Sequence, residues 1–267
     1  MNRRTYRSAL VAITALLFAI SLAAQDDAKQ FHWTGKLAAD QIVTIKNLNG
    51  TIDANGVSGD QIEVTADKIG PKADQIKIEV VPSSEGVTIC TMYPPAAFGG
   101  SMGPCEPGNH WHSSNVHSDN TRVNFTVHLP RNLRFSATSV NGSINAEDLG
   151  RSVQADSVNG SVRVSTDSWA EARSVNGTLR IRMGNAGWNG SLKLETVNGA
   201  VELDMPDNLS TDVRFSSVNG PINSAFPVTI SGGFVGHTAR GTIGSGGREL
   251  VVNTVNGSIS LKKGGGI

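Results

Sequence analysis

Three histidines that lie close together in the sequence have the clearest capacity for metal chemistry. His110, His112 and His117 form a His-Trp-His-x4-His pattern, and imidazoles at such short spacing can hold a zinc or copper ion. They fall in a long segment, residues 93–120, that is rich in Pro, Gly, Ser and His and shows no partner residues that would orient the ligands. We therefore predict a solvated loop without a bound metal, and metal capture by this loop stays as the alternative.

Acidic side chains are the second set with chemical capacity, because polysaccharide hydrolases and lyases need clustered carboxylates or a carboxylate beside a basic partner. The acidic residues of the predicted turns belong to different repeats of the chain; they are Glu147, Asp148, Asp167, Glu171, Asp204 and Asp207. No cluster of carboxylates is indicated. We predict that no residue is catalytic and that the protein is not an enzyme.

Two tryptophans and two glycine-rich segments complete the candidates. Trp169 and Trp188 could form a platform for sugar rings, although covering the end of a hydrophobic core is the commoner use of such residues. Segments 231–233 and 244–247 share only their glycine content with phosphate-binding loops, since no Gly-Lys-Ser/Thr sequence occurs. We predict no cofactor.

The two cysteines, Cys90 and Cys105, lie in the part of the chain that we expect to be exported. Oxidising compartments let disulfides persist, so we predict that the two cysteines pair, with two free thiols as the alternative. Closing a loop of this length stabilises the folded state by about 3 kcal/mol in the chain-entropy description.

The N-terminus has the layout of a secretory signal peptide. Three arginines within the first seven residues precede an apolar run, residues 9–24, that ends in small side chains. The run is shorter than the roughly 20 residues that span a bilayer, which favours cleavage after Ala23 or Ala24 over a retained anchor. We predict a signal peptide over residues 1–24, no transmembrane segment in the mature chain, and a periplasmic, secreted or cell-surface location.

Composition favours an all-β protein and excludes one class of partner. The chain has 30 glycines but only 5% aromatic residues, a balance that suits short strands joined by tight turns. Lys plus Arg equals Asp plus Glu at 23 each, so no basic surface is available for a nucleic acid. We predict an all-β fold without a nucleic-acid partner.

A short motif recurs along the chain and defines the architecture. Val-Asn-Gly occurs at residues 140–142, 158–160, 175–177, 197–199, 218–220 and 255–257, with a degenerate copy at 239–241 and an earlier Leu-Asn-Gly at 48–50. Self-similarity of this kind is the signature of a repeat architecture. A single coil cannot offset its ordering entropy, whereas stacked coils share hydrogen bonds and core. We predict about eight successive units stacked as the parallel coils of a β-solenoid.

The faces of each repeat decide between a hairpin and a corner. Asn-Gly between apolar runs is ordinarily a hairpin signal, but a hairpin would place Val140 on one face with Ser143 and mix core with solvent residues. If the chain is instead one continuous extended strand, Val140, Gly142 and Ile144 point to the same face. Before the valine, the apolar residues occupy the other set of alternate positions, so the alternation shifts by one residue there. We therefore expect the motif valines to face the core, and the hydroxyl residue before each valine, such as Ser157, to sit at the corner.

Stacking would align the asparagines of the motif into a column, which consists of Asn141, Asn159, Asn176, Asn198, Asn219 and Asn256. Amides can donate and accept along such a ladder, and a left-handed turn conformation is the equally favoured alternative. Two residues before the valine the repeats read Asp156, Arg173 and Glu195, which would place opposite charges on neighbouring strands. We interpret both columns as features that fix the register of neighbouring strands and keep the surface soluble.

Residues 31–130 are less regular. Five of their segments alternate polar and apolar residues as half-buried strands do, namely 41–45, 61–66, 75–80, 87–91 and 121–129. We predict that this strand-rich region, with its long loop at 93–120, caps a solenoid formed by residues 131–263, so that residues 31–263 make one continuous domain.

Together these features resemble a bacterial adhesin-like domain family, domain of unknown function 4097, which is related to the head domains of autotransporter adhesins. The resemblance covers residues 31–263 and is carried by the signal peptide, the repeated Ser-Val-Asn-Gly-Ser-Ile unit and the strand end Val127-His128-Leu129-Pro130. It implies a right-handed parallel β-helix and an envelope or surface location. The family defines no catalytic residues to carry over.

The sequence therefore predicts a non-catalytic, exported scaffold or adhesin-like interaction module that presents a long, flat β-surface to an envelope protein or a glycan. A carbohydrate-binding or carbohydrate-active β-helix protein is the alternative. Edge strands at the ends of a stack can pair with another copy, so self-association also stays open.

Overall fold

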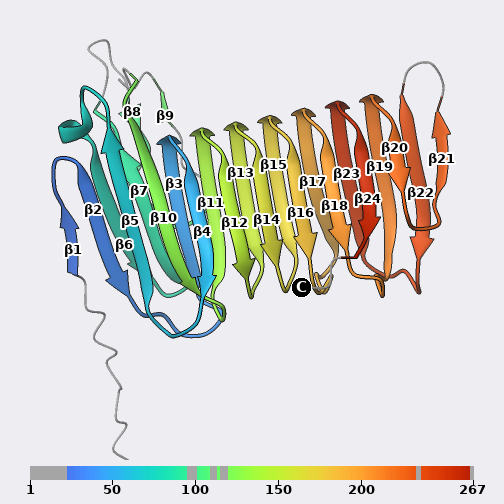
Figure 1. Ribbon diagram of the computed structural model, residues 1–267, viewed down its shortest axis with the longest axis horizontal. Helices are drawn as coiled ribbons and strands as arrows, with labels where there is room; N and C mark the ends of the chain where they lie inside the picture. Colours follow the sequence, from blue (N-terminus) through green and yellow to red (C-terminus); the bar gives the residue numbers. More distant parts are fainter. Residues whose placement is uncertain (1–22, 95–100, 109–112, 115–119, 233–235, 265–267) are drawn as a thin grey trace, which may run out of the picture.

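Two eleven-stranded sheets, here called sheet A and sheet B, form the body of the computed structural model, which describes residues 23–94, 101–108, 113–114, 120–232 and 236–264 (Figure 1). Sheet A consists, in spatial order, of β1 (Ala23–Asp26), β2 (Gln30–Gly35), β5 (Ile62–Ile69), β10 (Arg122–Pro130), β4 (Ile52–Val57), β12 (Ile144–Leu149), β14 (Val162–Thr166), β16 (Leu179–Met183), β18 (Val201–Met205), β24 (Ile259–Lys263) and β20 (Ile222–Ser224). Sheet B consists of β21 (Thr229–Gly232), β22 (His237–Ile243), β19 (Thr211–Asn219), β23 (Glu249–Asn256), β17 (Ser191–Asn198), β15 (Ala170–Asn176), β13 (Val153–Asn159), β11 (Arg134–Asn141), β3 (Ile42–Asn49), β7 (Gly86–Met92) and β6 (Lys77–Ser83). The remaining described elements are the short strands β8 (Ser101–Met102) and β9 (Ser113–Ser114) and the 3-10 turn η1 (Ala73–Gln75).

Each repeat except the degenerate copy at 239–241, which lies within β22, contributes one strand to each sheet. In the repeat formed by β13 and β14, the chain runs along sheet B, turns at the Val-Asn-Gly motif and returns along sheet A. Alternate side chains are buried on both strands, Val153 and Ala155 on one and Val162 and Val164 on the other, so the apolar faces enclose a core between the sheets. Neighbouring repeats pair in parallel within both sheets. The chain is a β-solenoid, and Asn-Gly is a corner and not a hairpin turn.

The expected direction of the motif valines is wrong. Val158, Val175, Val197, Val218 and Val255 are each 39–41% exposed. In β13 every second residue is buried, and this alternation continues through Ser157. Val158, the next residue, therefore points outward. The alternation of buried and exposed residues shifts only at Asn-Gly. The corner therefore lies one to two residues later in the chain than the pattern of apolar residues predicts.

The buried hydroxyl and the glycine of the motif hold successive corners together. Ser174 donates a hydrogen bond from Oγ to the carbonyl of Gly160 on the neighbouring repeat, at 2.9 Å, which satisfies a polar group that is otherwise buried. A Cβ atom at Gly177 would lie 2.1 Å from that same carbonyl oxygen. The corners stack so closely that this position has no room for a side chain.

The motif asparagines form a hydrogen-bonded ladder along the corners. In the spatial order Asn49, Asn141, Asn159, Asn176, Asn198, Asn256 and Asn219, each Nδ2 after the first donates to the Oδ1 of the preceding asparagine at 2.7–2.9 Å. No asparagine of this ladder has a positive φ. Of the two interpretations that the sequence left open, the structure has the ladder.

Removing an amide from the middle of the ladder should cost more than removing one from its end. Asn176→Ala deletes two hydrogen bonds, to Asn159 and from Asn198, whereas Asn219→Ala deletes only the bond to Asn256. Because these amides are exposed and water replaces part of the loss, we expect the free energy of unfolding to fall by about 1 kcal/mol for Asn176→Ala and by about half of that for Asn219→Ala. Urea denaturation measures both, and equal losses would contradict a ladder whose bonds contribute individually.

The repeats do not stack in sequence order. β23 and β24, the last repeat in the chain, lie between β17 and β18 on one side and β19 and β20 on the other (Figure 1). Asn256 accordingly sits between Asn198 and Asn219 in the ladder. The chain passes over one position in the stack after β18 and fills it with its C-terminal repeat.

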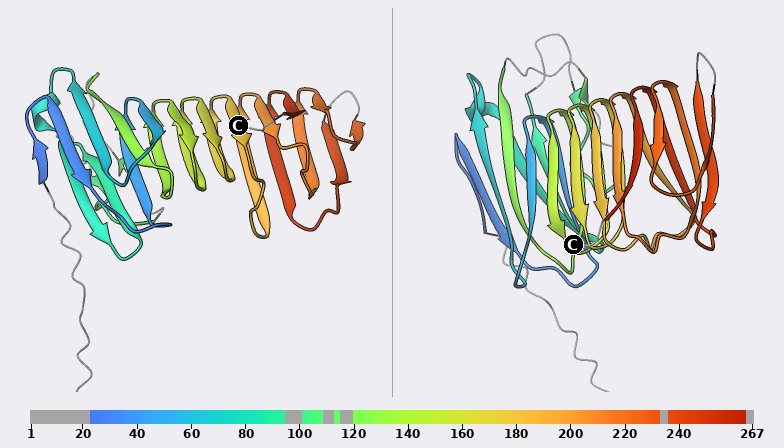
Figure 2. Two further views of the ribbon diagram at one scale, coloured as in Figure 1. Left: turned by 60° about the horizontal axis from the view of Figure 1, so that its bottom comes forward. Right: turned by 45° about the vertical axis from the view of Figure 1, so that its right-hand side comes forward.

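Antiparallel strands close both ends of the stack. At one end β1, β2, β5 and β10 pair antiparallel in sheet A, and β6 pairs antiparallel with β7 in sheet B. At the other end β22, which contains the degenerate copy 239–241, pairs antiparallel with β19 and β21. The five strands expected between residues 41 and 129 are all present, and residues 42–57 form a parallel coil against β11 and β12. Figure 2 shows these caps at the two ends of the coil stack.

Candidate functional site

A groove of about 380 Å³ lies on the outer face of sheet A, across β12, β14, β16, β18 and β24. Its polar lining consists of Glu147, Asp148, Arg163, Ser165, Arg180, Arg182, Glu202, Asp204 and Lys262. These residues come from different repeats, and parallel register places them on adjacent strands. The groove runs across the strands, so it could accept an extended ligand.

Ion pairs organise one side of the groove. The Nε atom of Arg180 lies 3.4 Å from Oε1 of Glu202, and Nε of Arg182 lies 3.4 Å from Oδ2 of Asp204. Lys262 approaches Glu202 to 4.0 Å. Both arginines use Nε in these contacts, and their terminal amino groups make no hydrogen bond within the described part of the chain, so they are available to a further acceptor.

A bulge shapes the other side of the groove. The register between β12 and β14 shifts after Ala146, and Asp148 adopts a left-handed conformation with φ of 55°. The Asp148 N–H donates to Oγ of Ser165 at 2.9 Å, which holds the bulge against β14. Bulges of this kind re-aim side chains and are frequent beside functional sites.

Three of the six sequence-predicted acidic residues, Glu147, Asp148 and Asp204, line the groove. They do not form one cluster, because β14 and β16 separate β12, which carries Glu147 and Asp148, from β18, which carries Asp204. Asp167 instead pairs with Arg131, Glu171 pairs with Arg173 on sheet B, and Asp207 is an exposed turn residue.

The other sequence candidates lie elsewhere. His110, His112 and His117 all fall outside the described residues, and in the described part of the chain no group of three or more His, Cys, Asp or Glu residues could hold a metal ion. Trp188 is buried, stacks under the guanidinium of Arg248 at 5.5 Å and donates Nε1–H to the carbonyl of Glu249. Trp169 packs partly buried against the core. Neither ring forms an open platform for a sugar.

The outer face of sheet B is partly covered by the loop that follows β7. Cys90 on β7 and Cys105 form a disulfide with an S–S distance of 2.03 Å. Beneath the loop, the Lys46 ammonium donates to the carbonyls of Glu106 and Gly108 at 2.7 and 2.6 Å. Desolvation by this burial lowers the pKa of Lys46. The stapled loop thus removes this end of sheet B from contact with a partner.

Further along sheet B, the predicted column of alternating charges is present. Asp156 pairs in register with Arg173, and Arg173 with Glu195, whose carboxylate lies 3.6 Å from the guanidinium. Burial is the largest effect on Asp156 and raises its pKa, while the Arg173 charge acts in the opposite direction. Arg173 thus pairs in register with both of its strand neighbours, while Oδ1 of Asp156 is buried without a hydrogen-bond partner among the described residues.

One row of polar side chains crosses the outer face of sheet A; we call it the polar track. Its members lie on successive strands and are Thr34, Glu63, His128, Asn55, Glu147, Ser165, Arg182, Asp204 and Lys262; they pair in register except between Glu147 and Ser165, where the bulge after Ala146 shifts the register. The groove occupies the C-terminal part of the track. The face is therefore polar over nine strands.

The N-terminal part of the track holds a cluster of one glutamate and two histidines that lie far apart in the sequence. Glu63 on β5 accepts from both neighbouring imidazoles, with His32 Nε2 at 3.2 Å and His128 Nδ1 at 3.3 Å. The hydrogen bond from His128, followed by that from His32, lowers the pKa of Glu63. The three residues meet only through antiparallel pairing in the cap, and nothing in the sequence spacing indicates that pairing.

Replacing the histidines should raise the pKa of Glu63 in order of their effect. His128→Ala should move the titration midpoint of the Glu63 carboxyl upward more than His32→Ala, measured by carbon-detected NMR. Since the folded-state pKa is lowered, the cluster stabilises the fold above the ordinary glutamate range near pH 4.3, and this contribution disappears as the pH falls through the lowered value. A midpoint that is unchanged in both variants would contradict the cluster.

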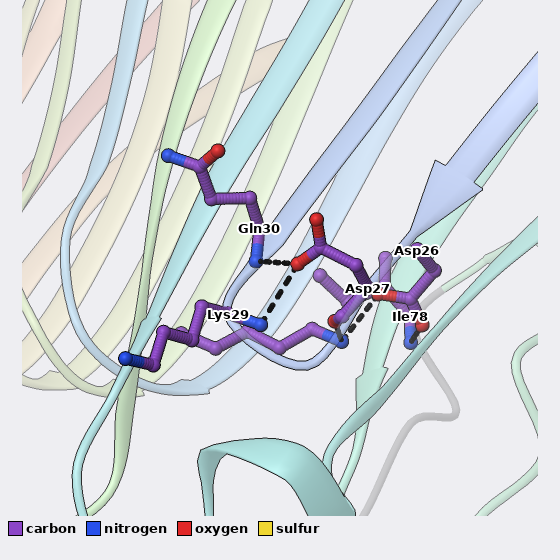
Figure 3. Close-up of polar contacts among 6 residues, drawn as sticks. Asp26, Asp27, Lys29, Gln30 and Ile78 are labelled. Carbon is purple, nitrogen blue, oxygen red and sulfur yellow. Dashed lines mark hydrogen bonds and ion pairs between the residues drawn. The ribbon is translucent and has the colours of Figure 1, made fainter.

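A second polar cluster secures β1 to the cap. Figure 3 shows Asp27 accepting from the backbone N–H groups of Lys29 and Gln30, at 2.9 and 2.6 Å, which closes the turn between β1 and β2. Asp26 bonds to the ammonium of Lys68, which is 2% exposed at its side chain, and also accepts from the Ile78 N–H at 3.3 Å. These contacts are structural and join three strands.

The described residues contain no helix with the length and apolar character needed to cross a membrane.

Comparisons with known proteins give one match along the sequence. The family model described as Toastrack DUF4097 matches residues 34–262. A search of curated proteins finds no match.

Two solved structures are similar in shape at low identity. A candidate cell adhesion protein from Clostridium sporogenes is 12% identical, with a TM-score of 0.46 and coverage of 88% of this chain and 100% of that chain. A candidate adhesin from Bacteroides fragilis is also 12% identical, with a TM-score of 0.38 and coverage of 87% and 96%. At these scores neither likeness carries an inference about what this chain binds.

Proposed function

The chain belongs to the Toastrack DUF4097 family, and from this premise we propose that it is an exported, non-catalytic interaction module that binds an envelope protein through the outer face of sheet A. One observation carries the proposal. The two outer faces differ, because the disulfide-stapled loop covers part of sheet B whereas the polar track of sheet A is exposed to solvent along the solenoid.

A rigid, flat and polar sheet face is suited to a macromolecular partner more than to chemistry. The groove lining is largely polar, and two of its four carboxylates, those of Glu202 and Asp204, pair with Arg180 and Arg182. The hydrogen-bonded ladder and the close-packed corners hold neighbouring repeats in a fixed register, so a partner would meet a preformed surface and little conformational entropy would be lost on binding.

Site-specific photo-crosslinking tests the binding face. A photoreactive residue at Ser165 in the groove should give a discrete adduct in cell envelopes, and the same residue at Lys193 on the outer face of sheet B should not. Excess unlabelled protein should compete the adduct away. An adduct at Lys193 with none at Ser165 would overturn the proposed face.

Export has its own test. N-terminal sequencing of the mature protein should begin at Ala24 or Gln25, because the signal peptide is proposed to be cleaved after Ala23 or Ala24. Either cleavage leaves Asp26 in place to pair with Lys68. A chain that keeps residues 1–22 in the cytoplasmic fraction would refute export.

Carbohydrate binding is the second candidate, and the polar track is the observation that favours it. Hydroxyl-rich polymers could hydrogen-bond along this row, but its residues include no Trp, Tyr or Phe ring on which a sugar would stack. A polysaccharide panel distinguishes the candidates: binding without turnover would favour the glycan, and turnover of any polysaccharide would refute the non-catalytic proposal.

A further inference from the structure

Arg163 in the groove occupies an unusual electrostatic position. It is exposed on β14, and within the described part of the chain its side chain makes no ion pair or hydrogen bond. Its direct neighbour on β16 is Arg180, so two arginines occupy directly paired positions on adjacent strands. Its neighbour on β12 is Asn145, whose amide is already turned toward Asp53 at 2.7 Å.

Around this position, by contrast, charged residues lie beside partners of opposite charge. Arg180 pairs with Glu202, Arg182 pairs with Asp204, and on sheet B Arg173 stands beside Glu195. Like charges directly opposite each other destabilise a sheet, whereas these opposite pairs stabilise it. The Arg163–Arg180 contact therefore has no explanation in the stability of the fold.

We propose that Arg163, Arg180 and Arg182 form an anion-binding site that receives a carboxylate of an acidic protein segment lying along the groove; this rests on the proposed function and names the chemistry of its partner. Guanidinium groups present planar pairs of donors that match a carboxylate. The terminal amino groups of Arg180 and Arg182 are free to join Arg163, because the existing ion pairs use Nε.

The acidic side of the groove favours a polypeptide as the carrier of that carboxylate. Glu147 and Asp148 lie beside the arginines, and their carboxylates have no ion-pair partner among the described residues. A bound segment therefore has to supply hydrogen-bond donors as well as an anion, and backbone N–H groups next to an Asp or Glu side chain supply both. The groove lining contains no aromatic ring that a sugar would stack on.

Binding of a hexaglutamate peptide to the full chain tests the site, with inorganic phosphate and tri-galacturonate as the competing probes. We expect the peptide to bind, with an affinity that falls with salt and falls about tenfold in Arg163→Gln. The matched control is Arg214→Gln, which removes an exposed arginine of sheet B that faces Glu249 at 3.3 Å and should leave affinity unchanged. Equal affinity in both variants would overturn the site, as would binding of phosphate or galacturonate but not of the peptide.

Thermal stability separates a binding role from a structural one. Arg163→Glu would place a carboxylate beside Arg180, so the melting temperature should stay equal or rise while peptide binding is lost. A lower melting temperature with binding intact would overturn the inference. A partner crosslinked at Ser165 that binds Arg163→Gln as tightly as the parent chain would also overturn it, and would leave the proposed function standing.

Discussion

Replacing Gly177 with alanine is expected to lower the free energy of unfolding by about 3 kcal/mol, because the corner stack has no space for one methyl group. The added Cβ would lie 2.1 Å from the carbonyl oxygen and 2.5 Å from the carbonyl carbon of Gly160. Both atoms belong to the backbone and cannot rotate away. The clash is therefore relieved only by moving the repeats apart.

Such a movement would disturb the hydrogen bonds that meet at the corner. Ser174 donates to the Gly160 carbonyl, Thr196 donates to the Gly177 carbonyl, and the Gly177 N–H donates to the Asn198 carbonyl at 3.1 Å. Two of the donors are buried hydroxyls, and a buried hydroxyl without an acceptor is costly. A loss of this size corresponds to a fall in melting temperature of about 6–12 °C for a chain of this length.

Gly187→Ala is the matched control. A Cβ there would first meet Oδ1 of Asn185 at 3.2 Å, which is the end of an exposed side chain that can turn aside. We expect a change within about 0.5 kcal/mol, as for ordinary surface substitutions. Guanidinium chloride denaturation of both variants measures the difference. Equal stability of Gly177→Ala and Gly187→Ala would contradict the close stacking of the corners.

The strands and the solenoid could be predicted because they depend on period and repetition, which a single chain displays. The alternation in β5, β7 and β10 gave correct positions to within two or three residues. The column Asp156, Arg173 and Glu195 was also predicted, because each residue has the same offset from its motif.

The direction of the motif valines could not be derived from parity. In each repeat the apolar residues occupy one set of alternate positions before the motif and the other set after it. The sequence alone does not show whether this shift occurs before Val158 or after it. The structure shows that the earlier parity continues to Ser157, because a buried hydroxyl can bond to the neighbouring glycine carbonyl. A buried serine at a corner looks unfavourable until its acceptor on the next repeat is known.

Neither the stacking order of the repeats nor the groove could be predicted from the sequence, for a related reason. The repeats carry nearly the same motif, so the sequence does not indicate whether the unit at residues 211–224 or the unit at residues 249–263 follows β18 in the stack; the structure places residues 249–263 there. Glu202 and Lys262 approach each other only because the last repeat takes that position. The site residues thus depend on which repeats become neighbours, and that choice is made in three dimensions.

Removing the buried ammonium of Lys68 is the second large perturbation that we expect, with Lys68→Ala lowering the free energy of unfolding by about 3–5 kcal/mol. The Lys68 side chain is 2% exposed, and its ammonium bonds to Asp26 and, at 2.9 Å, to the carbonyl of Asp27. Without it, the Asp26 carboxylate, 29% exposed, remains beside the core edge with no cation. Urea denaturation measures the loss.

Lys36→Ala provides the matched control, since Lys36 pairs with Asp60 at 2.7 Å but the two side chains are 64% and 76% exposed. Exposed pairs contribute at most about 1 kcal/mol, so this variant should differ little from the parent chain.

A double variant, Asp26→Leu with Lys68→Met, then identifies the cause of the loss in Lys68→Ala. If the loss in Lys68→Ala comes from an unpaired buried charge, the double variant should recover most of it, because neither charge remains. If the double variant is as unstable as Lys68→Ala, the ion pair is not the source of the loss, and the hydrogen bonds from Lys68 to Asp27 and from Ile78 to Asp26 would hold β1 in place instead.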